Sequence, residues 1–252
     1  MIYIDPPFNT GNKQVRKTLK VKRDANASRQ GFQGQNYQSQ VVKDMAYDDA
    51  TLDFIEAMQP RIQEALRVLH PTGTLYFHID YREAHYAKIM LDAIFGRVNF
   101  LNEIIWAYDY GAKSKKRWPT KHDTILVYVK DINQYYFDSE AVDREPYMAP
   151  GLVTPAKAAK GKLPTDVWWH TIVATNGKEK TGYPTQKPEG IVRRMILAST
   201  RPGDWCLDFF AGSGTLGAVA QKTNRHFVLV DSNLQAYQVM QQRLKSEKPY
   251  DE

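Results

Sequence analysis

Residues 1–8 read Met-Ile-Tyr-Ile-Asp-Pro-Pro-Phe, an apolar run that ends in two prolines. Residues 1–4 are typical of the end of a buried strand. Pro6 and Pro7 have fixed φ angles and no backbone N–H, so they end the strand and leave the preceding carbonyls as bare acceptors. Asp5 adds a carboxylate and Phe8 an aromatic face. This cluster suits an exocyclic amino group on a planar ring, although an ordinary strand-ending turn would look the same.

A second informative stretch, residues 206–215, reads Cys-Leu-Asp-Phe-Phe-Ala-Gly-Ser-Gly-Thr. Its two glycines let the backbone approach a ligand closely, and the N–H groups at the start of the following helix favour an anion. Asp231 follows the next apolar run, residues 226–230. A carboxylate at that place accepts hydrogen bonds from both ribose hydroxyls in nucleotide-binding α/β sheets, and the spacing alone would also suit a dinucleotide enzyme.

With both stretches present, the chain resembles the amino-methyltransferases of DNA, which transfer a methyl group from S-adenosylmethionine to adenine N6 or cytosine N4. The order of the motifs, Asp-Pro-Pro-Phe before Phe-Ala-Gly-Ser-Gly, is similar to that of the circularly permuted β group of this family. The resemblance implies that Asp5, Pro6, Pro7 and Phe8 are catalytic. Asp5 and the Pro6 carbonyl would accept the amino protons of a flipped base, and Phe8 would stack on that base.

The resemblance also implies a pocket for S-adenosylmethionine. The stretch Thr185-Gln186-Lys187-Pro188 looks like the family's segment before the cofactor strand, where Lys187 would meet the methionine carboxylate. A surface lysine before a helix is the alternative for Lys187. The expected cofactor-binding residues are Lys187, Asp208, Phe210, Ala211, Gly212, Ser213, Gly214, Thr215 and Asp231.

The hydrophobic periodicity predicts alternating strands and helices. Residues 52–69 and 83–95 read as helices, and residues 74–79 alternate as a strand. Further strands are expected at 102–108, 124–129, 204–209 and 226–230, and further helices at 190–200, 216–222 and 233–244. The pattern favours a doubly wound, mostly parallel α/β sheet of the Rossmann-like methyltransferase type. We expect residues 1–130 to form the catalytic half of the core, 131–181 an inserted target-recognition region and 182–252 the cofactor-binding half.

The insertion is the least regular part of the sequence. Prolines interrupt residues 131–181, where no core element is visible, and residues 156–162 resemble a short basic helix or linker. Trp168-Trp169-His170 is either a base-facing aromatic cluster or, as we prefer, the anchor that pins the insertion to the core. In the family this region reads the DNA target.

Two stretches concentrate the formal net charge of +6. Residues 13–29 contain seven basic residues and one acidic residue, and we expect a mobile loop over 13–45 that folds over DNA, with a solvated loop as the alternative. Residues 111–121 contain five cations, no acid and interleaved aromatic residues, which is typical of a nucleic-acid surface; a solvated hairpin tip is the rival. The expected DNA-binding residues are Lys13, Arg16, Lys17, Lys113, Lys115, Lys116, Arg117, Trp118 and Lys121.

Composition excludes several classes of protein. The single Cys206 rules out an internal disulfide, and the six histidines show no ligand spacing, so we expect no metal site. We find no signal peptide and no long apolar run, so a soluble cytoplasmic protein is expected. Double-stranded DNA is the expected partner. The sequence leaves open a homodimer and a cognate restriction endonuclease.

The sequence therefore predicts a DNA adenine-N6 methyltransferase, because Asp-Pro-Pro-Phe accompanies adenine more often than cytosine in the resembling family. Cytosine N4 is the first alternative. In the family, a segment with an edge strand and an adenine-holding acid normally precedes this motif, whereas this chain begins inside a strand, so an inactive DNA-binding fragment is the second. An NAD-type oxidoreductase is a weaker third, because no Tyr-Lys or His pair is placed for hydride chemistry.

Overall fold

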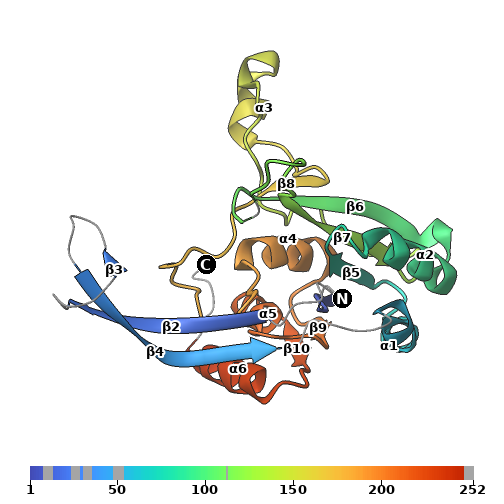
Figure 1. The fold of residues 1–252 in the computed structure, drawn as a ribbon. Helices are drawn as coiled ribbons and strands as arrows, with labels where there is room; N and C mark the ends of the chain where they lie inside the picture. The colour runs from blue at the N-terminus through green and yellow to red at the C-terminus, as the bar shows by residue number, and fades with distance from the viewer. Residues whose placement is uncertain (8–13, 24–28, 31–35, 48–53, 112, 247–252) are drawn as a thin grey trace.

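The computed structural model of the chain describes residues 1–7, 14–23, 29–30, 36–47, 54–111 and 113–246, with the parts between 14 and 47, and Ser246, described by their backbone alone. Among these residues the main sheet has seven strands in the order β10-β9-β1-β5-β7-β6-β8 (Figure 1). In chain order they are β1 (Ile2–Ile4), β5 (Thr74–Ile79), β6 (Phe100–Ala107), β7 (His122–Val129), β8 (Val167–Trp169), β9 (Trp205–Asp208) and β10 (His226–Leu229). The first strand of the chain thus lies in the middle of the sheet.

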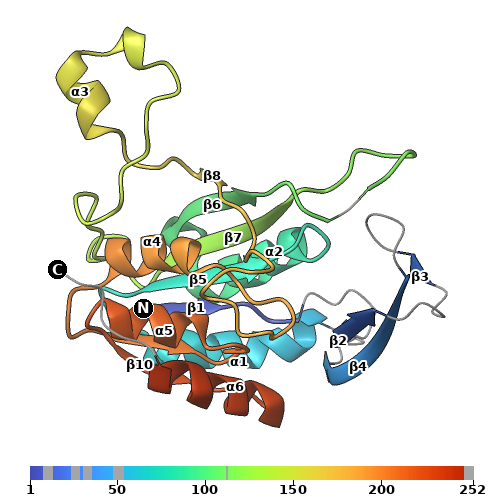
Figure 2. The same cartoon turned by 90° about the vertical axis from the view of Figure 1, so that its left-hand side faces the viewer.

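Strands β10, β9, β1 and β5 are parallel, whereas β7 runs antiparallel to both of its neighbours and β8 is parallel to β6. Helices cover both faces of the sheet (Figure 2). The helices are α1 (Phe54–Val68), α2 (Ala84–Phe95), η2 (Arg97–Asn99), η3 (Pro150–Leu152), α3 (Pro155–Lys160), α4 (Glu189–Ser199), α5 (Thr215–Lys222) and α6 (Leu234–Ser246). This is the doubly wound, mostly parallel α/β fold that the sequence predicts.

Strand β1 shows why the sheet needs both helical layers. Ile2 and Ile4 pack in the core cluster formed with α1 and α2, while Tyr3 packs in the cluster formed with α4 and α5. All three side chains are at most 2% exposed. A strand buried on both faces reads as a continuous apolar run, which explains the composition of residues 1–4.

A second, three-stranded antiparallel sheet contains β2 (Gln14–Arg23), β3 (Arg29–Gln30) and β4 (Asn36–Tyr47), in the order β2-β4-β3 (Figure 1). The predicted mobile loop over 13–45 is therefore wrong for these residues. Val15, Leu19 and Val21 alternate with basic residues in β2, which is a period-two pattern that the dominant charge obscured. Lys13 lies outside the described residues, and Arg16 and Lys17 lie in β2.

The insertion contributes a strand to the core, which the sequence did not predict. Strand β8 extends the main sheet by pairing in parallel with β6, in the register Trp106↔Trp168. Three residues are too few to show periodicity. The short basic helix is confirmed as α3, and it lies in an arm that projects away from the sheet (Figures 1 and 2).

Trp168 confirms the anchoring interpretation of the Trp-Trp-His cluster. Its side chain is 7% exposed within the core cluster, and its indole Nε1 donates to the Thr165 carbonyl at 2.7 Å. The neighbouring Trp169 is 72% exposed. Within the described parts of the chain, none of the helices combines the length and the apolar character needed to cross a bilayer.

Replacing Trp168 tests this anchor. Because the side chain is buried against the core, we expect Trp168→Ala to lower the free energy of unfolding by about 3–5 kcal/mol, measured by urea denaturation. Trp169→Ala is the matched control and should change the free energy by about 0.5 kcal/mol or less, since that ring faces solvent. Equal effects of the two substitutions would contradict the assignment.

Candidate active site

The Asp-Pro-Pro segment lies at the carboxyl edge of the sheet, directly after β1. The Oδ2 atom of Asp5 accepts a hydrogen bond from Lys187 Nζ at 2.5 Å, and the two side chains are only 16% and 10% exposed. The Oδ1 atom of Asp5 is also buried, and no described residue donates a hydrogen bond to it. One carboxylate oxygen is therefore held in place, and the other is a buried acceptor whose hydrogen-bonding capacity is unused within the described chain. Phe8 lies outside the described residues.

The glycine turn between β9 and α5 is built by backbone geometry that favours glycine. Gly212 and Gly214 have φ angles of +50° and +74°, in the left-handed region. A Cβ atom on Gly214 would lie 2.8 Å from Met240 Cγ, and one on Gly212 would lie 3.3 Å from Tyr183 Cε1. Asp208 Oδ1 accepts from the Phe210 N–H at 2.9 Å. The turn is thus tightly packed and cannot carry larger side chains at these positions without rearrangement.

Asp231 ties the glycine turn to the end of β10. Its Oδ2 accepts from the Gly212 N–H and its Oδ1 from the Asn233 N–H, both at 2.8 Å. Carboxylate oxygens each have two lone-pair sites, so these bonds leave capacity for ribose hydroxyls.

A cavity of 510 Å³ brings most of the predicted residues together. It is lined by Asp5, Pro7, Lys187, Asp208, Phe210, Ala211, Gly212, Ser213, Thr215 and Asp231, but not by Pro6 or Gly214. Sequence reasoning missed Tyr3, Tyr183 and Asn233, which also line it. The first two could have been found from their position beside the Asp-Pro-Pro and Thr-Gln-Lys-Pro motifs.

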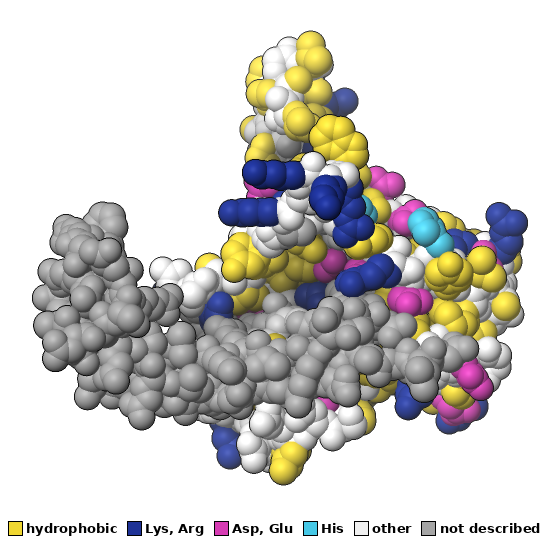
Figure 3. Space-filling model, viewed as in Figure 1, with side chains coloured by type: hydrophobic (Ala, Val, Ile, Leu, Met, Phe, Trp, Pro, Cys, Tyr) yellow, Lys and Arg dark blue, Asp and Glu magenta, His cyan; other side chains and the backbone are white. Residues whose placement is uncertain are grey.

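A wider cleft of 1160 Å³ adjoins this cavity, and Lys187 lines both. Its walls include Trp106, Tyr108 and Asp123, and two of the predicted DNA-binding residues, Lys113 and Arg117. The cleft is not lined by the other predicted DNA-binding residues of segment 111–121, which are Lys115, Lys116, Trp118 and Lys121. Trp118 is 94% exposed. On the face shown in Figure 3, Lys and Arg side chains gather below the α3 arm.

The carboxyl groups of Asp5, Asp208 and Asp231 line the smaller cavity, and a different factor limits the charge repulsion at each of them. Burial raises the pKa of Asp208 well above its usual range, and the nearby charges of Asp5 and Asp231 raise it further. Asp5 has the Lys187 ammonium as its counter-ion, and Asp231 has backbone N–H donors. The cavity therefore avoids three uncompensated charges.

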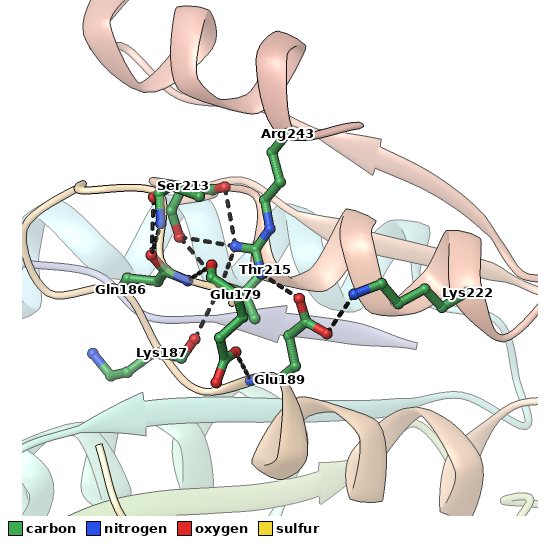
Figure 4. A network of polar contacts seen from close by, with 9 residues as sticks. Glu179, Gln186, Lys187, Glu189, Ser213, Thr215, Lys222 and Arg243 are labelled. Carbon is green, nitrogen blue, oxygen red and sulfur yellow. Dashed lines mark hydrogen bonds and ion pairs between the residues drawn. The ribbon is translucent and has the colours of Figure 1, made fainter. Parts of the chain in front are cut away.

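A buried polar network fixes the Thr-Gln-Lys-Pro segment against the glycine turn (Figure 4). Glu189, at the start of α4, accepts from Arg243 Nη2 at 2.6 Å and from Lys222 Nζ at 2.7 Å. Arg243 Nη1 donates to Thr215 Oγ1 at 3.0 Å, and Thr215 Oγ1 donates to the Lys187 carbonyl at 3.2 Å. Burial alone would raise the pKa of Glu189, but the hydrogen bonds from Lys222 and Arg243 lower it. Nothing local in the sequence marks Arg243 as part of the site.

A strand, a glycine turn, a helix and an acid after the next strand are the parts from which doubly wound α/β proteins build nucleotide-binding sites. More particularly, the chain belongs to the DNA methylase family, whose model matches residues 1–242.

The chain is similar to two curated relatives. It is 33% identical over 208 residues to the Type II methyltransferase M.HpaI of Haemophilus parainfluenzae. The matched stretch covers 81% of this chain and 65% of that protein. It is also 33% identical over 188 residues to the DNA adenine methyltransferase YhdJ of Escherichia coli strain K12, with 71% and 63% covered. The chain thus spans slightly less than two thirds of these relatives.

Solved structures agree with the fold. The chain is similar to M1.HpyAVI in its SAM complex, with a TM-score of 0.58, 23% identity, and 77% of this chain and 85% of that chain covered. It is also similar to the cytosine-N4-specific PvuII DNA methyltransferase, with a TM-score of 0.56, 15% identity, and 77% and 78% covered. At these identities the likeness concerns the fold alone.

Arg243→Met tests the network around Glu189. Removing one partner of a buried ion pair leaves charge without full compensation, so we expect a loss of about 3 kcal/mol in the free energy of unfolding. Arg67→Met removes an exposed pair with Glu64, whose side chains are 69% and 64% exposed, and serves as the control. Its effect should stay below about 1 kcal/mol. Urea denaturation that ranks the two variants equally would show that the network adds nothing to stability.

Proposed function

We propose that the chain is an S-adenosylmethionine-dependent DNA methyltransferase that modifies adenine N6. This proposal rests on the hydrogen bonding of the two Asp5 carboxylate oxygens. Its Oδ2 is bound by Lys187, while its buried Oδ1 has no described donor, at the cavity that the glycine turn and Asp231 also line. An acceptor held in this way suits an exocyclic amino group, which supplies the missing N–H.

The residues of the smaller cavity fit S-adenosylmethionine. Ala211, Gly212 and Ser213 of the glycine turn line the cavity, and Asp231 offers oxygens for ribose hydroxyls. When bound, S-adenosylmethionine supplies a methyl group carried on a positively charged sulfur. We assign its binding to the predicted set of cofactor residues, with one change: Lys187 acts on Asp5 rather than on the methionine carboxylate.

In the proposed reaction the chain orients the amino group and stabilises charge. Asp5 Oδ1 accepts one amino hydrogen of the flipped adenine, and the Pro6 carbonyl accepts the other, so that the nitrogen lone pair points at the methyl group. Transfer would form the new nitrogen–methyl bond as the methyl–sulfur bond of the cofactor breaks and leaves a neutral thioether, and the Asp5 carboxylate would accept the proton that the methylated nitrogen loses. Fixed geometry and preorganised charge supply most of the acceleration. Phe8 is proposed to stack on the base.

The motif order supports the permuted β group, and the name of the E. coli relative supports adenine. Residues 131–181 are proposed to read the DNA target. The basic turn with Lys113 and Arg117 is proposed to contact phosphates beside the cleft, together with Lys13, Arg16 and Lys17. A cytoplasmic location, a homodimer and a cognate endonuclease remain predictions, the last in line with the Type II name of the H. parainfluenzae relative.

The central experiment is expression in a host that lacks DNA methylation, followed by single-molecule sequencing and nucleoside analysis of the DNA. We expect N6-methyladenine in one sequence context. N4-methylcytosine would replace the adenine assignment. Unmodified DNA, together with no heat of S-adenosylmethionine binding in calorimetry, would support the inactive fragment instead.

Asp5→Ala should abolish methyl transfer while the dissociation constant for S-adenosylmethionine stays within about tenfold of wild type, because the carboxylate is assigned to the base. Turnover is measured with tritiated cofactor, and binding by calorimetry. Wild-type-like turnover would remove Asp5 from the mechanism.

Asp231→Ala and Gly212→Val should each weaken S-adenosylmethionine binding by at least about tenfold, by removing the ribose acceptor and by placing a branched side chain at a left-handed turn. Gly151→Val is the control, because a Cβ there meets nothing within 4 Å. Calorimetry that finds normal binding in both site variants would place the cofactor elsewhere.

A further inference from the structure

One loop separates the two cavities of the site. Among the described residues, those that line both the smaller cavity and the wider cleft are Tyr183, Thr185, Gln186 and Lys187. All of them lie just before α4, in a stretch that we call the dividing loop (residues 181–187). The loop also carries the ammonium that binds Asp5. Its shape therefore affects how the contents of the two cavities meet.

A side-chain amide fixes the shape of the dividing loop. Gln186 Oε1 accepts from the backbone N–H and from the hydroxyl of Thr181, both at 2.9 Å. Gln186 Nε2 donates to the Glu179 carbonyl at 2.7 Å (Figure 4). The Thr181 hydroxyl in turn accepts from the Tyr183 N–H at 3.2 Å. The loop is thus closed on itself, with the Gln186 amide at its centre.

The loop is also tied to its surroundings on both sides of Gln186. The Glu179 side chain accepts from the Glu189 N–H at 2.8 Å, at the first residue of α4, and the Lys187 carbonyl accepts from Thr215 Oγ1 at 3.2 Å (Figure 4). Gln186 is the peptide neighbour of Lys187. A change at the Gln186 amide therefore acts directly on the backbone that carries the Lys187 ammonium.

The backbone of the dividing loop is strained at Thr185. Its φ angle is +56°, in the left-handed region, which is unusual for a β-branched residue. Among the described residues other than glycine, only Asn224 shares a positive φ, at +57°, and asparagine tolerates that conformation more readily. Such strain persists only where the surrounding structure fixes it. The hydrogen bonds of the neighbouring Gln186 supply that restraint.

We propose that the dividing loop aligns the target base with the methyl donor, and that Gln186 is the positioning residue that holds the loop. This inference rests on the proposed function, and it adds that the flipped base reaches Asp5 from the wider cleft while S-adenosylmethionine occupies the smaller cavity. Gln186 acts through Lys187, whose ammonium holds Asp5 Oδ2. A displacement of about 1 Å at a reacting group can cost 100-fold in rate, so loosening the loop should lower turnover.

Asn99 provides a matched control for Gln186. Its amide also joins two segments through both of its polar atoms, because Nδ2 donates to the Phe95 carbonyl at 2.7 Å and Oδ1 accepts from the Ile132 N–H at 3.0 Å. Asn99 lines neither cavity. Gln186→Met and Asn99→Leu each replace a bonded amide by an apolar side chain of similar size, so the two variants differ in place rather than in chemistry.

The first experiment measures kcat and the dissociation constant for S-adenosylmethionine in both variants, on the DNA sequence that the wild type methylates. We expect Gln186→Met to lower kcat about 10- to 100-fold while the dissociation constant stays within about tenfold of wild type, because the glycine turn and Asp231 supply other parts of that cavity. Asn99→Leu should keep kcat. Wild-type kcat in Gln186→Met, an equal loss in Asn99→Leu, or a loss that saturating cofactor restores overturns the proposal.

Thr185→Gly tests the same loop in a variant that should fold, since glycine adopts a left-handed φ without strain. Asn224→Gly is its control, because Asn224 has nearly the same φ and lines neither cavity. Glycine leaves the dividing loop more freedom, so we expect Thr185→Gly to lower kcat about 3-fold or more, whereas Asn224→Gly should keep it. Wild-type kcat in Thr185→Gly would show that the shape of the loop does not govern turnover.

The last experiment does not depend on activity, so it separates failure of this inference from failure of the proposed function. NMR follows amide hydrogen exchange and the ¹⁵N signal of the Lys187 ammonium, assigned through Lys187→Arg. We expect Gln186→Met to speed exchange of the Thr181 N–H and to shift or broaden the Lys187 signal, while Asn99→Leu speeds exchange at Ile132 alone. A Lys187 signal that ignores Gln186→Met overturns the inference. The expected signals in a protein that leaves DNA unmodified would locate the failure in the proposed function.

Discussion

The ion pair between Asp5 and Lys187 is the contact on which the rest of the site depends. It joins residues 182 positions apart, one directly after the first strand of the chain and the other before helix α4. Taking two charges out of water is costly, and their attraction offsets that cost only when the geometry is good. Two parts of the fold position the two partners. Strand β1 places Asp5 at the edge of the sheet, and the network of Glu189, Thr215 and Arg243 holds the backbone of Lys187.

Neighbouring parallel strands end at the same edge of a sheet, and in this protein three of them bring aspartates together at that edge. Asp5, Asp208 and Asp231 follow or end β1, β9 and β10, which are neighbours in the sheet. The convergence creates a cavity rich in acceptors, suited to amino and hydroxyl donors, and it also creates repulsion. The chain limits that repulsion with one ammonium, a set of backbone N–H donors and a raised pKa at Asp208.

The insertion is part of the same architecture. Strand β8 extends the main sheet beside β6, and Trp168 fills its core, so residues after the α3 arm reach the wall of the wider cleft from a fixed support. Under the proposed function, the segment proposed to read DNA and the segment proposed to perform the chemistry share one sheet, which would hold them in a fixed relation to a flipped base.

The sequence by itself determined the helices and strands whose hydrophobic pattern is local and long enough to repeat, such as α1, β5 and α2. It also marked the Asp-Pro-Pro segment and the glycine turn, because prolines and left-handed glycines act through their own backbone, and it marked Asp231 by its place after the next strand. Only the tertiary structure decided the rest. Strand β8 is too short to show a period, and the pattern in β2 was hidden by charge. The pairing of Lys187 with Asp5, and the buried hydrogen bonds of His78 with Tyr3 and Asp123, depend on the order and register of strands far apart in the chain, which no local pattern encodes.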